Sequence, residues 1–268
     1  MQHRGALATI LGGRKTYPRL GAVTTVPNQT VTIQEWNATA LTVIDWGDGQ
    51  TTNHPALTGT AVSHIYAVAG TYTIQLQVNP LAVTRMDFRG VGLRVYSAYL
   101  RRCVNTVYFR CDTGPLGILN SVDMVDWRPA YWLCFNLPAG FTGVFNFADM
   151  IDWRPVTWYC YGLPAGLLPL TVAAANFAGW VGCSSFNISG DTLTQVQVDA
   201  VLTGLYSAFA TRTATGGTIN VGGNNAAPSG VLQAMCPPTT GKERAYELVN
   251  DSCGINPTKK WATVTITA

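Results

Sequence analysis

The stretch that decides the fold is MVDWRPAYWLCFNLPAG, residues 124–140, because it returns as MIDWRPVTWYCYGLPAG at residues 150–166. Each residue that the two copies share lies 26 positions after its counterpart. One period earlier, Gly114 and Ile118 stand at the positions that Gly140 and Val144 occupy in the next unit. Self-similarity at a fixed period of this length is typical of chains built from stacked units.

The period also indicates what kind of stack to expect. It lies within the range of leucine-rich repeats, in which each unit supplies one strand and an apolar strip runs along the core. Met86-Asp87-Phe88-Arg89-Gly90 resembles the strand that begins such an array. Aromatic residues and cysteines stand where leucine normally recurs. For residues 81–190 the sequence therefore predicts a leucine-rich-repeat-like solenoid with irregular units.

Residues 21–80 predict a small β unit ahead of the repeats. VTTVP (23–27), TVTIQEW (30–36), LTVIDW (41–46) and YTIQLQV (72–78) alternate apolar and polar side chains, as half-buried strands do. WGDG at 46–49, HIY at 64–66 and GTYTIQLQV at 70–78 resemble the PKD domain, a small immunoglobulin-like β-sandwich. That resemblance implies a spacer or binding module and dictates no activity.

Asp45, Asp48 and His64 have two interpretations. They would form a calcium or acid/base cluster, or they would serve the turn at residues 46–49 and the packing at a strand edge. We favour the second interpretation, because a PKD-like sandwich needs the turn whatever its function.

Each repeat places tryptophan, arginine and other aromatic side chains close together, and two interpretations stay open. On one exposed face these groups would form a ladder suited to stacking on sugars or to a protein partner. Alternatively the tryptophans fill the core between units and the arginines cover them. Recurrence favours the core, because structural positions must recur in every unit. The candidate binding residues are Trp127, Arg128, Tyr131, Trp132, Trp153, Arg154, Trp158 and Tyr159.

Residues 191–268 predict a small α/β unit that caps the end of the solenoid. Apolar residues at helical spacing predict a helix over 192–209, with Asp191 or Thr192 as its N-cap, and a second helix follows over 240–249. Strands are expected at 217–221 and 261–267. Cys236 and Cys253 flank the second helix and form a disulfide only in an oxidising setting, so the sequence leaves their state open.

The same part of the chain carries a second resemblance. LTQVQVDAVLTGLY (193–206), INVGGNNAAPSG (219–230), PPTTGKERAYELVND (237–251) and WATVTIT (261–267) resemble the C-terminal part of proteins that phages and prophages encode. In those proteins a PKD-like start and leucine-rich-like repeats precede the same ending, so the likeness spans roughly residues 21–268. It implies association with a virion and carries over no catalytic residues.

The composition narrows the set of partners. Charged residues make up only 12% of the chain, about half the usual share, which suits a surface packed against neighbours and a homo-oligomer. The net charge is +3, and no face of the chain is expected to be basic enough to follow a phosphate backbone. We therefore expect no nucleic-acid partner. No apolar run reaches the roughly 18–20 residues of a membrane span, and no membrane partner is expected.

The first twenty residues predict a basic arm that attaches the chain to a particle. Their basic residues are Arg4, Arg14, Lys15 and Arg19, with no acidic residue among them. The apolar stretch from Ala6 to Leu11 is too short for a signal-peptide core. We therefore expect assembly in the host cytoplasm, release by lysis and a place on the virion surface.

No nucleophile elbow, zinc-protease motif or phosphate-binding glycine loop occurs in the sequence. We therefore expect a protein that is not an enzyme and that has no metal site or cofactor. The favoured function is a structural bacteriophage protein, either a capsid decoration or a tail or fibre component. It would bind other virion proteins, with a host-surface glycan or protein as a further ligand. The alternative is a bacterial surface adhesin or carbohydrate-binding module.

Overall fold

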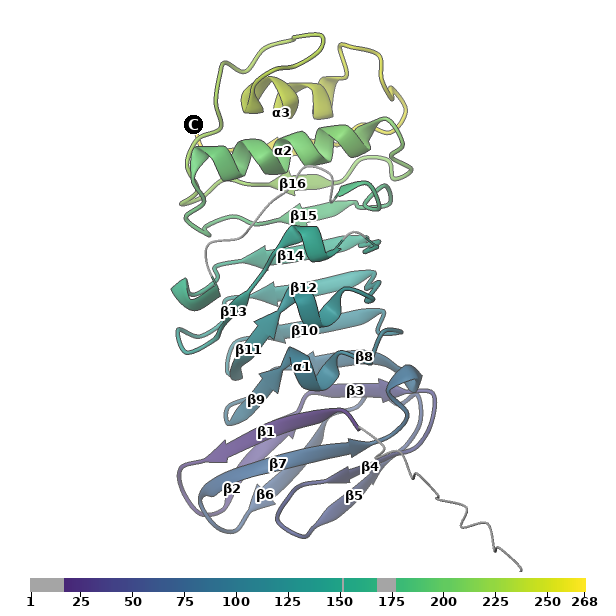
Figure 1. Ribbon diagram of the computed structural model, residues 1–268, viewed down its shortest axis with the longest axis vertical. Coiled ribbons are helices and arrows are strands. Elements are labelled where there is room, and N and C mark those ends of the chain that lie inside the picture. Colours follow the sequence, from purple (N-terminus) through teal and green to yellow (C-terminus); the bar gives the residue numbers. More distant parts are fainter. Residues whose placement is uncertain (1–16, 151, 168–176) are drawn as a thin grey trace, which may run out of the picture.

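The computed structural model describes residues 17–150, 152–167 and 177–268. The chain is elongated and mainly β, with a strand-rich unit at one end and two helices at the other (Figure 1). One sheet has eight strands in the order β17-β16-β15-β14-β12-β10-β8-β3, and a second has seven in the order β13-β11-β9-β1-β7-β4-β5. Of the predicted arm, Arg19 lies in β1, whereas Arg4, Arg14 and Lys15 lie outside the described residues.

The N-terminal unit consists of strands in two layers. Tyr66 of β6 stacks on Tyr72 of β7 and donates a hydrogen bond to the carbonyl of Trp46, which follows β4, so the layers share one core. Antiparallel pairing joins β1, β7, β4 and β5, and separately β2 and β6. The strands are β1 (Arg19–Thr24), β2 (Gln29–Ile33), β3 (Glu35–Ala38), β4 (Thr42–Asp45), β5 (Thr51–His54), β6 (Val62–Tyr66) and β7 (Gly70–Gln77).

Both large sheets continue across the predicted boundary at residue 80. β1 pairs with β7 on one side and with β9 on the other, and β3 pairs with β8. Residues 21–80 and 81–190 are therefore joined by backbone hydrogen bonds as well as by a linker, and the strand-rich unit seals one end of the stack.

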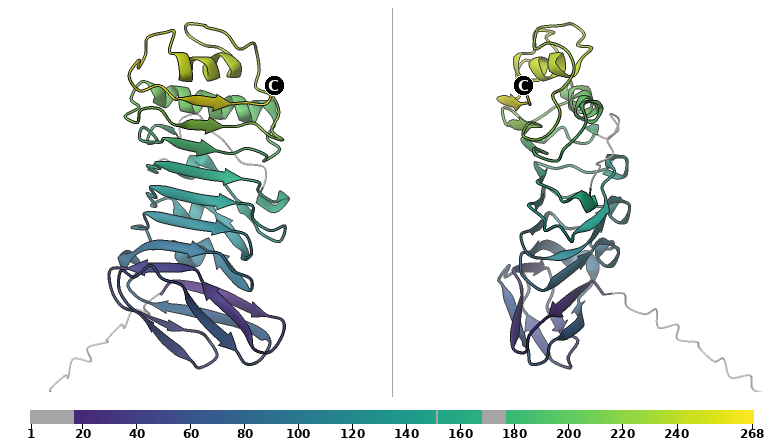
Figure 2. Two further views of the ribbon diagram at one scale, coloured as in Figure 1. Left: turned by 180° about the vertical axis from the view of Figure 1, so that it is seen from behind. Right: turned by 90° about the vertical axis from the view of Figure 1, so that its left-hand side faces the viewer.

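In the middle of the chain, each unit contributes one strand to the eight-stranded sheet, and most also contribute one to the seven-stranded sheet. The strands β8, β10, β12 and β14 are parallel neighbours, and residues 26 positions apart in β12 and β14 pair in register, such as Trp132 with Trp158. Figure 2 shows these strands stacked one above another. The elements are η1 (Pro80–Ala82), β8 (Val83–Phe88), β9 (Leu93–Tyr96), α1 (Ser97–Leu100), β10 (Tyr108–Asp112), β11 (Leu116–Asn120), η2 (Ser121–Met124), β12 (Tyr131–Phe135), β13 (Thr142–Val144), η3 (Phe147–Met150), β14 (Thr157–Tyr161) and η4 (Ala165–Leu167).

The C-terminal part continues the stack. β15 (Ser185–Asn187), β16 (Thr218–Asn220) and β17 (Thr263–Thr265) extend the eight-stranded sheet in parallel, while α2 (Gln195–Phe209) and α3 (Gly241–Asn250) pack on each other. The predicted N-cap of α2 was wrong. Thr194 caps the helix through the amide of Gln197, whose side chain bonds back to Thr194, whereas Thr192 has a positive φ of 54°.

The cysteines fall into two groups. Cys236 and Cys253 form a disulfide that ties the loop before α3 to the segment after it. The other cysteines are buried free thiols, as expected of small apolar side chains. Cys111, Cys134 and Cys160 stand in register across β10, β12 and β14, and burial raises the pKa of Cys134 and Cys160 well above the ordinary value.

A buried arginine joins the loops of the C-terminal part. The guanidinium of Arg212 lies 3.9 Å from the ring centre of Trp261, and burial lowers its pKa to about 10. In place of a carboxylate it donates to backbone carbonyls, two of them at 2.7 Å and 3.1 Å from Nη1. Those carbonyls belong to Cys183, Ala214, Gly216, Lys259 and Lys260.

We expect Arg212→Lys to lower the free energy of unfolding by about 3 kcal/mol or more, because an ammonium group leaves several buried carbonyls without a donor. Urea denaturation measures the loss. The matched control is Arg128→Lys, at a side chain that is 65% exposed and should change stability little. Equal stability of the two variants would contradict the role of Arg212.

Asp191 is a buried carboxyl in the loop after β15. Asp191 accepts a hydrogen bond from the amide of Leu163 at 3.0 Å, but its Oδ2 has no partner, and burial raises its pKa to about 7. One unit further on, Asn225 accepts from the amides of Asp191 and Leu193 and donates to the carbonyls of Ile188 and Val221. The side-chain amide of Asn225 thus bonds both amides and carbonyls of the backbone, whereas the carboxyl of Asp191 accepts from the amide of Leu163.

The raised pKa makes stability depend on pH. The folded chain keeps a proton on Asp191 that the unfolded chain releases near pH 4, so this contribution to stability is present below about pH 4 and is lost as the pH rises to about 7. We expect Asp191→Asn to gain in melting temperature over the wild type across this range and to keep the gain at pH 8. Asp152→Asn, at an exposed position, is the control. If the difference in melting temperature between the wild type and Asp191→Asn stayed constant from pH 4.5 to 8, the raised pKa of Asp191 would be contradicted.

Candidate functional site

The repeated tryptophans are core residues, as the favoured interpretation expected, and this removes them from the candidate binding residues. Trp127, Trp132, Trp153 and Trp158 are each 0% exposed. Trp132 and Trp158 point inward from β12 and β14, where Trp132 stacks on Phe109 at 4.5 Å between ring centres.

The other two tryptophans lie in the connections that lead into these strands. Trp127 donates to the carbonyl of Arg101, and Trp153 to that of Met124, so each ties its unit to the previous one. None of the four can stack on a sugar without unfolding the core.

The outward side chains of the same strands form the candidate site. Tyr131 and Tyr159 alternate with the buried tryptophans, and Tyr131 is 41% exposed. We call this surface the tyrosine face; it lies on the side of the eight-stranded sheet that is turned to the viewer on the left of Figure 2. It comprises Arg85, Tyr108, Arg110, Tyr131, Leu133, Phe135, Tyr159 and Tyr161.

Two rows of contacts fix the side chains of the tyrosine face. In the first, Glu35 holds Arg85 at 2.7 Å, the guanidinium of Arg85 lies 3.6 Å from the ring centre of Tyr108, and Tyr108 lies 6.0 Å from Tyr131. Each of these contacts joins side chains on two adjacent strands. The row therefore keeps a charged end near β3 and an aromatic end at β12.

The second row lies at the C-terminal ends of β10, β12 and β14. Arg110 donates two hydrogen bonds to Asp112 and lies 5.4 Å from the ring centre of Phe135. Phe135 stacks on Tyr161 with an interplanar angle of 6° and 5.0 Å between ring centres. These side chains give up little freedom on binding, because neighbours already hold them.

A buried carboxylate lies between these rows. Asp87 is 1% exposed and accepts two hydrogen bonds from Arg89, at 2.7 Å and 2.8 Å. Burial raises the pKa of Asp87, against the effect of Arg89, and the bond to Asp87 raises the pKa of Arg89.

The sequence found part of this face. It named Tyr131 and Tyr159, but missed Tyr108, Phe135 and Tyr161. Tyr108 pairs in register with Tyr131, Tyr161 stands two positions after Tyr159, and Phe135 pairs in register with Tyr161. The remaining candidates, Arg128 and Arg154, are exposed in the connections before β12 and β14. Arg128 lies 3.7 Å from Asp152, one unit on, in an ion pair open to solvent that contributes little.

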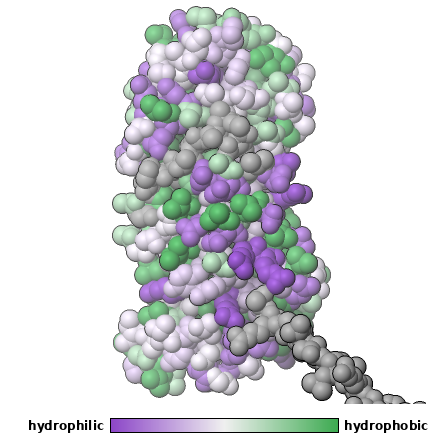
Figure 3. Space-filling model, viewed as in Figure 1, coloured by the Kyte–Doolittle hydropathy of each residue, from purple (hydrophilic) through white to green (hydrophobic). Residues whose placement is uncertain are grey.

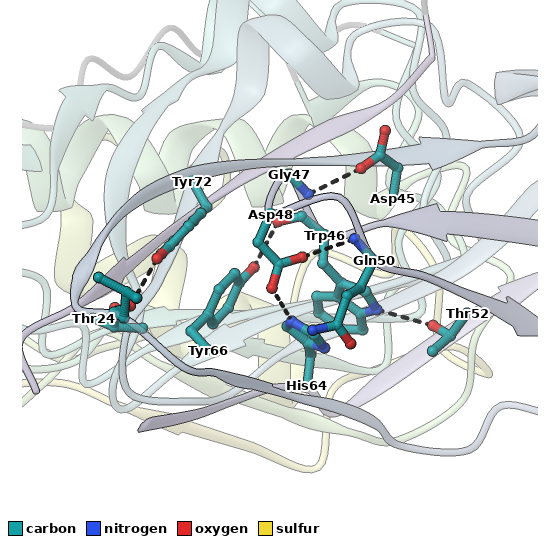
Figure 4. A network of polar contacts seen from close by, with 11 residues as sticks. Thr24, Asp45, Trp46, Gly47, Asp48, Gln50, Thr52, His64, Tyr66 and Tyr72 are labelled. Carbon is teal, nitrogen blue, oxygen red and sulfur yellow. Dashed lines mark hydrogen bonds and ion pairs between the residues drawn. The ribbon is translucent and has the colours of Figure 1, made fainter. Parts of the chain in front are cut away.

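The cluster around His64 serves the turn, as favoured from the sequence (Figure 4). Asp45 accepts from the amide of Gly47, and Asp48 accepts from that of Gln50 and pairs with His64 at 2.7 Å. Burial alone would raise the pKa of Asp48, but the bonds from His64 and Gln50 outweigh it and hold the pKa below its ordinary value. In the described part of the chain, no serine, threonine or cysteine is hydrogen-bonded to His64.

The arrangement is suited to binding. Beside the tyrosine face, the carboxylates of Asp87 and Asp112 are each held by the arginine two positions away, Arg89 and Arg110. One group of metal-ligating types occurs in the described residues, Cys236, Glu247 and Cys253, and there the disulfide occupies both sulfur atoms. No helix within the described ranges has the length and apolar character to cross a membrane.

Comparisons with models of protein families, with curated proteins and with solved structures found no match.

Adjacent residues of β12 offer a direct check of which side binds. We expect Trp132→Ala to lower the free energy of unfolding by about 3–5 kcal/mol, because it opens a large cavity in the core. Tyr131→Ala, one position away on the outer side, should cost far less. Denaturation of both variants measures the difference, and a similar cost for the two would mean that the sides are assigned wrongly.

Proposed function

We propose that the chain is a structural protein of a bacteriophage particle, a capsid decoration or a tail or fibre component, that works without catalysis. Its tyrosine face binds a protein, either a neighbouring virion protein, another copy of this chain or a protein on the host surface. The observation that carries the binding role is a row of ordered aromatic and arginine side chains on the outside of a rigid sheet. Tyrosine and arginine are the residues that dominate binding energy at protein interfaces.

The ring geometry favours a protein over a sugar as the ligand. Sugars bind to the flat face of an aromatic ring, but Phe135 and Tyr161 turn their faces to each other at 5.0 Å. The guanidinium of Arg85 likewise covers Tyr108. The second candidate function is glycan binding, as in a bacterial adhesin or carbohydrate-binding module. It would depend mainly on the rings of Tyr131 and Tyr159.

Other features support the placement on a virion surface. The chain has few charged residues, and the C-terminal quarter resembles phage and prophage proteins. The finer fold belongs to the same proposal. The two-layered N-terminal unit with its Trp46–His64–Tyr66 cluster supports a PKD-like domain, and the parallel, in-register units support a leucine-rich-repeat-like solenoid.

The first test is quantitative mass spectrometry of purified particles from the source. We expect the chain to be present, at a simple ratio to the major capsid protein for a decoration role or at a few to some dozens of copies for a tail role. Absence from particles contradicts the virion proposal.

The second test concerns the tyrosine face. We expect a chain with Tyr131→Ala and Tyr159→Ala to melt near the wild-type temperature but to lose cross-links to its neighbour in particles. Tyr246→Ala, a half-buried tyrosine on α3, is the control and should keep them. If the double variant keeps these cross-links but loses binding to a glycan array, the adhesin candidate takes the place of the protein-binding one.

A further inference from the structure

A cationic hollow lies beside the start of β1. It has a volume of about 300 Å³ and is formed where three segments meet: the entry to β1, the turn η1 and the helix α1 with the residues after it. Its lining consists of Tyr17, Arg19, Pro80, Ala98, Tyr99, Arg101 and Arg102. We call this site the arginine hollow.

The charge of the arginine hollow is one-sided. Three arginines line it, and the lining includes no acidic residue. Arg19 and Arg101 are exposed, and neither takes part in the ion pairs of the described residues. Arg101 and Arg102 also line a neighbouring hollow, which contains the carboxylates of Asp123 and Asp126; Asp123 accepts a hydrogen bond from Ser97 at 2.6 Å. Figure 3 shows strongly hydrophilic residues gathered on this side of the molecule, near the height of α1.

The backbone around the arginine hollow is well fixed. Arg19 pairs with Gln75 in β1 and β7, and the amide of Leu76 donates to the carbonyl of Pro18. Asn105 donates to the carbonyl of Leu81 at 2.7 Å, which holds the segment after α1 against η1. The arginines therefore converge from strands and turns whose positions do not depend on a ligand.

The rim of the hollow adds aromatic groups. Tyr99 is 50% exposed and packs edge-on against Tyr96 at 5.4 Å, and Tyr17 lies on the same lining. A phenol hydroxyl donates to a carboxylate, and the ring offers apolar contact to the rest of a peptide.

We propose that the arginine hollow binds clustered carboxylates on an acidic segment of a protein, which, if the proposed function holds, is the particle protein that carries the chain. Guanidinium groups bind carboxylates in a two-pronged geometry and stay charged at every physiological pH. A protein segment fits better than a nucleic acid, because the cations converge on one hollow, whereas a phosphate backbone requires them along a track.

The experiment titrates the purified full chain with hexaglutamate peptide, in calorimetry at low and at physiological salt. We expect binding that weakens with salt, and a loss of affinity of about tenfold or more in Arg19→Gln with Arg101→Gln, because two charge-assisted contacts are removed. Arg128→Gln with Arg244→Gln removes the same charge elsewhere and should stay within about twofold of the wild type. Melting curves confirm that both variants fold.

Several results overturn the inference: no binding of hexaglutamate, equal binding by the two double variants, displacement of the peptide by millimolar inorganic phosphate, or tighter binding of a six-nucleotide oligothymidylate through the same arginines. A chain that binds hexaglutamate through Arg19 and Arg101 but is missing from particles upholds the arginine hollow and rejects only the virion proposal.

Discussion

The stacking of inward aromatic side chains between neighbouring parallel strands is the constraint on which the rest of the molecule depends. Phe109 lies on Trp132, and Trp158 lies on Phe186, with interplanar angles of 12° and 15°. Such offset or parallel contacts between large rings contribute more than their buried area alone. Because the strands are also hydrogen-bonded in register, a shift of one residue in any unit would move its ring from the core to the solvent.

That constraint determines the outer surface as well. Where Trp132 and Trp158 point inward, Tyr131 and Tyr159 must point outward, on adjacent strands and two register positions apart. The tyrosine face is therefore a consequence of the core, and its rigidity comes from the same hydrogen bonds. The arginine hollow has another origin, since it forms where the N-terminal unit meets the first units of the stack. The tyrosine face and the arginine hollow are thus two separate surfaces of the chain.

The repeat predicted one strand in each unit, whereas most units contribute one strand to each of the two large sheets. It also left open which side of each strand is buried. In the segment Tyr131–Phe135 all five residues are aromatic, aliphatic or cysteine, so no alternation of polar and apolar residues marks the inner side. Only the paired strands on both sides settle it. The mainly β class was predicted correctly.

Features that depend on distant residues were beyond the reach of the sequence. Arg19 and Arg101 lie far apart in the chain, and nothing local predicts that they line one hollow. The pairing of β1 with β9, which joins two predicted domains into shared sheets, is equally non-local. The N-cap of α2 failed for a local reason, because three residues with capping side chains, Asp191, Thr192 and Thr194, stand close together.

The most direct test of the account is hydroxyl-radical footprinting of the free chain and of the chain in purified particles, read by mass spectrometry at single residues. The account predicts that Tyr131 and Tyr159 are oxidised in the free chain and protected in the particle, while Trp132 and Trp158 stay unreactive in both. Reactive tryptophans in the folded free chain would contradict the fold. Tyrosines that are oxidised equally in both states would contradict the binding role of the tyrosine face.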